Sequence, residues 1–208
     1  MEQTPALIQT FRAAAEKVSA VVSEVETMAQ VISYTVDLCE RKEACRLLVS
    51  GCEAQLSDPA GALCNHKQQK VIAAPELSEE RTRFAADLCK ERGIGFVRDG
   101  LRDHLAGIDI GLTMVDFGIA ETGTLIIDSS SEEIRLATMI SEVHVAVLPV
   151  DRIRPAAFDL EEELNGMFGR VPNYCAFVTG ASRTADIERV LALGVHGPLE
   201  LHILLLSE

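Results

Sequence analysis

Aromatic residues are scarce in this sequence: among 208 residues there is no Trp, and there are only two Tyr. Surfaces that bind single-stranded nucleic acid stack the bases on aromatic rings, so this scarcity argues against such a function. The formal net charge of -13 at pH 7 argues against nucleic acid and anionic membranes as partners, because both repel an acidic protein. No apolar run reaches about 18 residues, so we expect no membrane-spanning helix.

Closely spaced cysteines are absent as well. The six Cys form no C-x-x-C pair, whereas zinc and iron–sulfur sites normally include at least one close pair. We therefore predict no metal site and no cofactor bound by this chain. The first residues lack the basic region of a secretory signal peptide, so a cytoplasmic location with reduced thiols is expected.

The hydrophobic pattern changes near residue 44 and divides the chain into two parts. Apolar residues recur at helical spacing through 6–20 and again through 21–43, which predicts an N-terminal helical appendage over residues 1–43. From residue 44 to residue 208, short apolar β-branched runs alternate with helical patterns, one of them over 185–193. This alternation predicts a three-layer α/β domain with a largely parallel sheet, in which ligands bind at the carboxyl ends of the strands.

The first candidate site precedes the apolar run 125–127, which is predicted to be a buried strand. Glu121 lies there beside Thr122, Gly123 and Thr124. A carboxylate at the margin of a buried strand is costly unless it is paired, hydrogen-bonded or used in chemistry. Glu121 is therefore a candidate nucleophile or general base, and the alternative is a turn with a satisfied Glu.

The second candidate site is a loop of small residues predicted to open the helix over 185–193. Gly180, Ser182 and Thr184 would leave backbone N–H groups free at the positive end of the helix dipole, and Arg183 would add a guanidinium. This pattern predicts a binding site for a carboxylate or phosphate. The alternative is a helix capped by Ser182 or Thr184, with Arg183 bridging to Asp186.

His196 lies in a Gly-Pro turn before the last apolar run, 201–206. It is a candidate base near pH 7, and the alternative is a hydrogen bond to a carbonyl of the turn. His144 and His202 both lie within predicted strands and are interpreted as satisfied core or surface residues rather than ligands.

Several motifs together resemble the lactate-utilisation (LUD, LutC/YkgG-like) family, closely over about residues 100–208 and only in outline before that. The motifs are Gly111-Leu-Thr-Met-Val-Asp-Phe-Gly-Ile-Ala-Glu-Thr-Gly-Thr-Leu125, Val143-His-Val-Ala-Val147, Thr179-Gly-Ala-Ser-Arg-Thr-Ala-Asp-Ile-Glu188 and Leu193-Gly-Val-His-Gly-Pro198 with Glu200-Leu-His202. The family pattern marks eight matching positions without giving them chemical roles: Glu121, Thr122, Gly123, Ser182, Arg183, Asp186, His196 and Gly197.

The resemblance implies a fold similar to ribose-5-phosphate isomerase, glucosamine-6-phosphate isomerase and the CoA-transferases. It also implies a link to the oxidation of lactate to pyruvate, with partner subunits that carry iron–sulfur clusters and, as a further candidate, flavin. This chain lacks the clustered Cys of cluster-bearing relatives, so it resembles the small subunit without its own cluster.

Three hypotheses for the function follow. In the first, the chain is a subunit of a lactate- or 2-hydroxy-acid-oxidising system. The loop 180–184 binds the anionic substrate, and Glu121 and His196 are the acid/base groups. In the second, it is a stand-alone enzyme acting on CoA esters or sugar phosphates, with Glu121 as the nucleophile. In the third, it is a non-catalytic assembly or regulatory module that docks through the apolar stripe 22–38. A homo-oligomer is compatible with each.

Overall fold

The computed structural model describes residues 3–42, 69–104, 107–169, 171, 173–187, 190–193 and 197–208, and side chains are described outside 3–4 and 183–193. Helices and strands alternate along most of this length. The elements are α1 (Gln3–Lys17), β1 (Ala20–Val25), α2 (Met28–Arg41), β2 (Val71–Ala73), α5 (Glu79–Glu91), β3 (Gly95–Val97), η1 (Leu101–His104), β4 (Ile108–Met114), β5 (Phe117–Ile119), β6 (Thr124–Asp128), α6 (Glu132–Met139), β7 (Ser141–Pro149), η2 (Val150–Arg152), β8 (Ile153–Arg154), η3 (Ala157–Leu160), α7 (Glu161–Phe168), β9 (Cys175–Val178), β10 (Arg183–Ile187), β11 (Val190–Leu193) and β12 (Glu200–Leu206).

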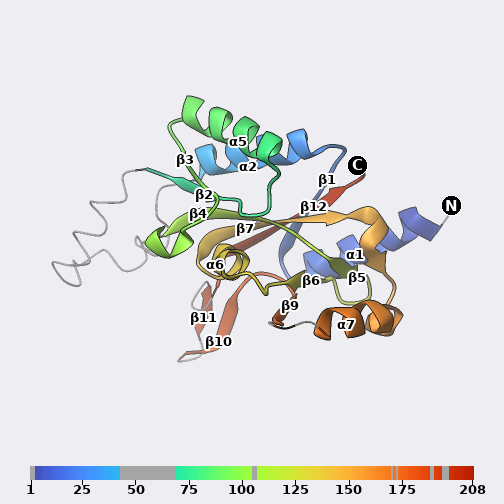
Figure 1. Cartoon of the computed structure of the whole chain (residues 1–208). Helices are drawn as coiled ribbons and strands as arrows, with labels where there is room; N and C mark the ends of the chain where they lie inside the picture. Colours follow the sequence, from blue (N-terminus) through green and yellow to red (C-terminus); the bar gives the residue numbers. More distant parts are fainter. Residues whose placement is uncertain are drawn as a thin grey trace.

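A six-stranded sheet forms the centre of the molecule, in the order β1-β12-β7-β4-β2-β3 (Figure 1). Every pairing between neighbouring strands in it is parallel. The long strands β7 and β12 are buried along nearly their whole length. Parallel sheets are buried on both faces, which explains the continuous apolar runs in the sequence. The prediction of an α/β domain with a largely parallel sheet is confirmed.

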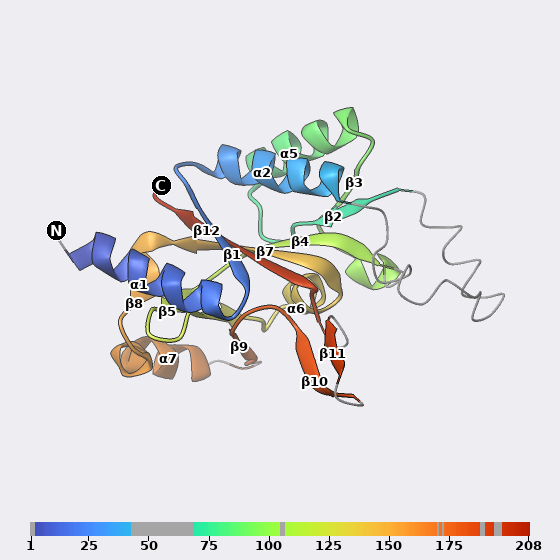
Figure 2. The ribbon, with the colours of Figure 1, turned by 180° about the vertical axis from the view of Figure 1, so that it is seen from behind.

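Helices α2 and α5 cover one face of this sheet, and both views show them lying side by side (Figures 1 and 2). Apolar residues of α2, including Val31, Ile32 and Val36, join Val145 and Leu204 of the central strands in one buried cluster. Ser78 accepts a hydrogen bond from the Arg81 N–H at the start of α5 (3.4 Å). Helix α5 thus begins at the cap that its sequence predicts.

The opposite face is covered by α1, α6 and a second sheet of order β8-β5-β6-β9, with α7 outside it (Figure 2). Phe11 and Ala15 of α1 belong to a second buried cluster, which also contains Leu125 of β6 and Leu148 of β7. Its members from β12 are Leu201, Ile203 and Leu205. The second sheet therefore stacks against the first through apolar side chains that alternate along each strand.

The N-terminal segment is not a helical appendage, and a helix over 21–43 is not what the chain forms. Residues 20–25 are strand β1, which pairs in parallel with β12. Ala20 and Val22 are buried and Val21 between them is exposed, an alternation that is typical of a strand. The β-branched Val21, Val22 and Val25 favour that conformation. The predicted boundary between residues 43 and 44 lies outside the described residues.

The apolar stripe 22–38 is correspondingly used inside the fold. Its residues Val22, Val25, Met28, Val31 and Val36 are all buried within this chain. Most of the stripe is therefore unavailable for docking, although Leu38 at its end is only partly buried, and the hypothesis of an assembly module loses most of the observation that motivated it.

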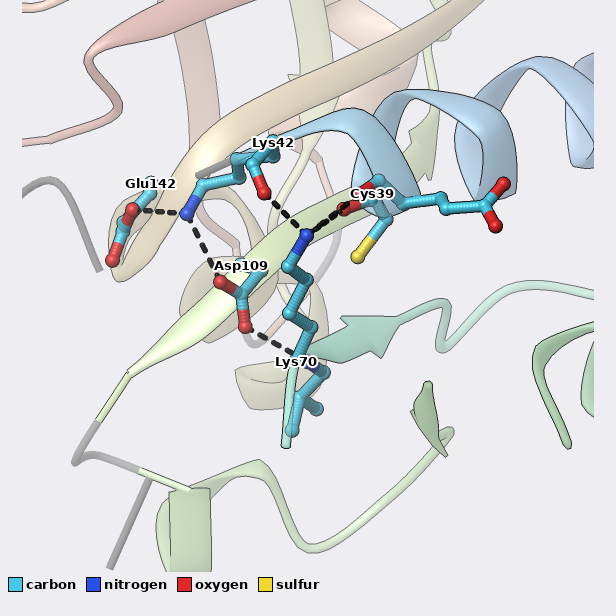
Figure 3. A network of polar contacts seen from close by, with 7 residues as sticks. Cys39, Lys42, Lys70, Asp109 and Glu142 are labelled. Carbon is cyan, nitrogen blue, oxygen red and sulfur yellow. Dashed lines mark hydrogen bonds and ion pairs between the residues drawn. The ribbon is translucent and has the colours of Figure 1, made fainter. Parts of the chain in front are cut away.

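A buried network of charged residues ties the end of α2 to the amino ends of β4 and β7 (Figure 3). Lys42 Nζ lies 3.0 Å from Asp109 Oδ1 and 2.5 Å from Glu142 Oε2, and the side chain of Lys42 is only 6% exposed. Burial alone would lower the pKa of Lys42, but its hydrogen bonds with Glu142 and Asp109 outweigh burial and raise that pKa. Lys70 donates to the carbonyls of Cys39 (2.9 Å) and Glu40 (2.8 Å), so two lysines hold the last turn of α2.

Candidate functional site

Glu121 lies at the surface, in the turn between the antiparallel strands β5 and β6. Its backbone N–H donates to the Pro155 carbonyl (3.0 Å), and its Oε1 accepts from the N–H of Ala157 (3.2 Å). The carboxylate therefore caps the start of η3. This agrees with the alternative interpretation of Glu121, a turn with a hydrogen-bonded Glu. A catalytic role of Glu121 stays a prediction.

The neighbouring threonines form a chain of hydroxyl groups that leads to the second predicted loop. Thr122 Oγ1 lies 2.7 Å from Thr124 Oγ1, which lies 2.8 Å from Thr179 Oγ1. Strand β9, which ends at Val178, pairs with β6 and brings Thr179 to this position. The structure thus joins two of the motifs that the sequence placed more than 50 residues apart.

Gly123 and Gly180 both face the end of helix α1. Their φ angles are +66° and +76°, in the left-handed region that glycine adopts readily. A Cβ on Gly123 would lie 2.3 Å from the backbone N of Ala15, and one on Gly180 would lie 2.3 Å from the carbonyl O of Val18. These glycines therefore let two turns pack against the backbone of α1 and of Val18, which directly follows it. The sequence pattern could not distinguish this use from the close approach of a ligand.

The loop 179–184 does not open a helix, so the prediction of a helix over 185–193 is wrong. Residues 183–187 and 190–193 are strands β10 and β11, an antiparallel pair with an irregular register between Thr184 and Ile187. The β-branched residues Thr184, Ile187 and Val190 favour strands, and cross-strand pairing outweighs the local helical pattern. The loop consequently has no helix N-terminus, and the argument for anion binding from a helix dipole falls.

The remaining predicted residues have different positions. Arg183, Thr184 and Asp186 lie in β10, where only the backbone is described, and His196 lies outside the described residues. Ser182 donates its N–H to the Pro198 carbonyl (2.9 Å), and its side chain lies beside Gly197. The loop 179–182 and the Gly197-Pro198 turn therefore lie together. Convergence of Glu121, Arg183 and His196 on one pocket stays a prediction.

A cavity of about 380 Å³, here called the His144 cavity, lies beside this loop. It is lined by residues from strand β7, helix α6, strand β9 and the two loops. The polar lining residues are Ser129, Arg135, Thr138, His144, Tyr174, Thr179 and Ser182. Gly180 and Gly197 also line it, so predicted residues contribute to one wall of the cavity while its other walls come from elsewhere in the chain.

His144 lies on β7 and is only 2% exposed. Its Nε2 lies 2.9 Å from the hydroxyl of Thr113 on the neighbouring strand β4. Burial lowers the pKa of His144 to about 4, so its imidazole is neutral near pH 7. A neutral imidazole in a cavity can accept a proton from a bound hydroxyl group, with Thr113 fixing the ring.

Arg135 lies on α6 at another wall of the cavity. Its Nη1 donates to the carbonyls of Ser129 (2.6 Å) and Ser130 (2.9 Å), and its guanidinium carbon lies 5.6 Å from the centre of the Tyr174 ring. These contacts hold a guanidinium in place, the group that suits a carboxylate. Together with His144 and the hydroxyls of Thr179 and Ser182, it makes the cavity fit a small hydroxylated anion.

Sequence reasoning assigned His144 to the core and did not single out Arg135. A signal for His144 was present, because a histidine within an otherwise apolar strand, 143–148, is costly unless it is hydrogen-bonded or used. Arg135 carried no such signal, since a single arginine in a short amphipathic helix is usually solvated. Only the fold brings α6 beside β7 and β9.

The other cysteine and acidic groups do not form a metal centre in the part of the chain that the structure describes, where no group of three or more His, Cys, Asp or Glu could hold an ion. Burial raises the pKa of Cys39 to about 12 and that of Cys89 to about 11, so both thiols are protonated near neutral pH. Among the described helices, none is both long and apolar enough to cross a membrane.

Comparison with known proteins places these observations in a family. The chain is 38% identical over 96 residues to a lactate utilization protein C of Shouchella clausii, a match covering 44% of this chain and 41% of that protein. It is 32% identical over 147 residues to the protein of the same name in Anoxybacillus flavithermus, covering 66% of this chain and 63% of that protein. The chain thus matches well under two thirds of the length of the first of these relatives.

The fold is also known from experiment. A crystal structure of a DUF162 family protein from Deinococcus radiodurans matches with a TM-score of 0.57 at 18% sequence identity, over 98% of each chain. That similarity concerns the fold alone. The sequence model of the LUD domain matches residues 8–206, which include both faces of the central sheet and the whole His144 cavity. The chain belongs to the LUD domain family.

Proposed function

We propose that this chain is a component of a lactate utilisation system and binds lactate, or a related 2-hydroxy acid, in the His144 cavity. Membership of the LUD domain family and the similarity to proteins named lactate utilization protein C support this proposal. The observation that carries it is the placement of a neutral, buried His144 and a fixed Arg135 at the walls of one cavity.

The chemistry of the cavity suits this substrate. The carboxylate of lactate would lie at Arg135, and its hydroxyl group would lie at His144, with Thr179 and Ser182 completing the hydrogen bonds. Oxidation of lactate to pyruvate releases two electrons and two protons. In this proposal His144 takes the hydroxyl proton during the reaction and, because its pKa is about 4, releases it to solvent afterwards, while the other groups fix the substrate in place.

The electrons need an acceptor outside the described part of this chain. Iron–sulfur clusters, or flavin, on partner proteins would supply that redox chemistry. The described residues contain no cluster of metal ligands that would fit such a centre. Glu121 lies in the turn between β5 and β6, Arg183 begins β10, and His196 lies outside the described residues. All three remain candidates for contacts made in the assembled system.

Calorimetric titration with L-lactate tests the binding step. Arg135→Gln is expected to weaken binding by about tenfold or more, because a charge-assisted hydrogen bond is lost. Arg83→Gln is the matched control, since Arg83 is an exposed arginine on α5, on the other face of the sheet. Equal affinity of the two variants would contradict the proposal.

Activity of the assembled system tests the role of His144. His144→Gln is expected to reduce lactate-dependent electron transfer by a factor of about 100 or more, the usual contribution of a general base. Its fold must be checked by circular dichroism, because the residue is buried. If Arg135→Gln weakens binding but His144→Gln keeps full activity, the binding site stands and the proton-acceptor role is wrong.

The hypothesis of a stand-alone enzyme acting on CoA esters or sugar phosphates has less support in the structure. The anion-binding loop 180–184 belonged to the first hypothesis, and the segment expected to be a helix after it forms the antiparallel strands β10 and β11, so a helix dipole supports neither hypothesis. The nucleophile of the stand-alone enzyme, Glu121, is an exposed residue hydrogen-bonded to Ala157. Thermal-shift measurements with both ligand classes would separate the two hypotheses.

A further inference from the structure

A second polar cluster lies on the other face of the central sheet, between α2 and β12. The phenol oxygen of Tyr34 lies 2.8 Å from His202 Nδ1, and His202 Nε2 lies 3.2 Å from Glu200 Oε2. An ionised carboxylate only accepts hydrogen bonds, so Nε2 carries the proton and donates to Glu200. In a neutral ring Nδ1 then accepts, and the Tyr34 hydroxyl donates to it. The three side chains therefore form a directed relay from Tyr34 through His202 to Glu200.

This relay faces a cavity of about 370 Å³, here called the Tyr34 cavity. Tyr34, Leu38 and Arg41 line it from α2, where a spacing of four and then three residues puts them on one face of the helix. Lys42, Glu142, Val143, Leu199, Glu200 and His202 line the rest. His202 is only 6% exposed, whereas the Glu200 side chain is 39% exposed, so the relay runs from the wall of the cavity to its open side.

The charged side chains at this cavity differ in whether they already have a partner of opposite charge. Lys42 is held by Asp109 and Glu142, and Glu200 is held by His202. Arg41 donates from Nε to the carbonyl of Asp37 on its own helix (3.1 Å), and no carboxylate of the described residues pairs with its guanidinium. Arg41 is thus the cation best able to hold an incoming anion.

We propose that the Tyr34 cavity is a second acid–base site, which binds a small hydroxy acid with its carboxylate at Arg41 and its hydroxyl group at Tyr34. The phenol oxygen has lone pairs left to accept the ligand hydroxyl, because its own proton is donated to His202. The three hydrogen bonds run in one direction, from the ligand hydroxyl to Tyr34, from Tyr34 to His202 Nδ1 and from His202 Nε2 to Glu200, so the relay polarises the ligand hydroxyl without leaving a free alkoxide. This arrangement follows the general logic of a reactive hydroxyl, a base and an orienting carboxylate.

The Tyr34 cavity is separate from the His144 cavity, and binding in it does not depend on lactate binding in the His144 cavity. The sequence offers a way to observe each cavity alone, because it contains two Tyr and no Trp. Tyr34 lines the Tyr34 cavity, and Tyr174 lines the His144 cavity. Tyr174→Phe therefore leaves a fluorescent reporter only in the Tyr34 cavity, and Tyr34→Phe leaves one only in the His144 cavity.

Fluorescence titration of the Tyr174→Phe protein with glycolate and acetate tests the binding. Glycolate is expected to give a saturable change with about fivefold higher affinity than acetate, which lacks the hydroxyl group. Adding Arg41→Gln should weaken binding of glycolate by about tenfold, whereas adding the control Arg83→Gln should leave it unchanged. Absence of a saturable change, or an equal response with Arg41→Gln, would overturn the proposal. So would a glycolate response seen only in the Tyr34→Phe protein.

Nitration by tetranitromethane, which attacks the ionised phenol, tests the relay in the same Tyr174→Phe protein. Glu200→Gln is expected to slow the nitration of Tyr34 at neutral pH by about fivefold, because the imidazolium that takes its proton loses its carboxylate. Glu80→Gln, a change at an exposed residue of α5, is the control. An unchanged nitration rate in Glu200→Gln, with an unchanged unfolding midpoint, would show a purely structural hydrogen bond and overturn the relay.

Discussion

Two histidines on adjacent strands of one sheet have opposite surroundings. His144 on β7 pairs in register with Leu201, and its neighbour Val145 pairs with His202 on β12. Because side chains alternate along a strand, a shift of one residue sends the two rings to opposite faces. His144 meets a hydroxyl group in a cavity without a described carboxylate partner. His202 meets a phenol and a carboxylate.

The comparison shows that the two faces of one sheet give histidine different hydrogen-bond partners. Burial beside Thr113 lowers the pKa of His144 and keeps its ring neutral. At the Tyr34 cavity both ring nitrogens of His202 have hydrogen-bonded partners: Nδ1 accepts from Tyr34 and Nε2 donates to Glu200. Charged residues are concentrated on that second side, where Lys42, Asp109 and Glu142 fix the end of α2.

Lys42→Met tests how far the His202 side depends on its charges. The variant removes the cation that Asp109 and Glu142 contact, and these carboxylates stay buried. Breaking a buried ion pair typically costs about 3–5 kcal/mol of unfolding free energy. Urea denaturation measures this loss, with the exposed Lys17→Met as the control. A loss no larger than that of Lys17→Met would mean that Lys42 is not needed by this side.

Gly180→Ala tests the His144 side, where backbone packing replaces charge. The new Cβ would overlap the Val18 carbonyl and would also need a φ of +76°. Strain and overpacking together should cost about 2–4 kcal/mol. Gly93→Ala is the matched control, because Gly93 has a φ of +66° with nothing within 4 Å of its Cβ. Equal losses in the two variants would show that the contact with α1 contributes nothing.

The sequence predicted the fold where local pattern and tertiary context agree. The apolar runs 143–148 and 201–206 are buried strands, and Ser78, a residue type that favours the N-cap, begins α5. The prediction was wrong where the apolar residues of a short segment fit both the spacing of a helix and the alternation of a strand. Residues 21–25 continue a helical stripe but pair with β12, which is far along the chain, and residues 185–187 and 190–193 lie in paired antiparallel strands, because strand pairing decides such segments.

The candidate site was predictable only in part for the same reason. Gly180 and Ser182 do line the His144 cavity, but the small residues that suggested a ligand also serve α1. Arg135 and His144 come from a helix and a strand that no pattern in the sequence links. Their convergence is a property of how α6, β7 and β9 pack.

The pH dependence of stability sharpens the difference between the two histidines most directly. The pKa of His144 is about 4 in the folded protein against an ordinary value of 6.5, so the unfolded chain binds more protons between these values. Stability should therefore fall as the pH drops from 6.5 toward 4, by up to about 3 kcal/mol from this residue.

Urea denaturation at several pH values, compared between the wild type and His144→Gln, isolates that part of the slope, because other titrating groups contribute to both proteins. His104→Gln, which removes a histidine from the surface turn η1, should keep the wild-type slope. If His144→Gln and the wild type lose stability in parallel, His144 does not stay neutral in the fold.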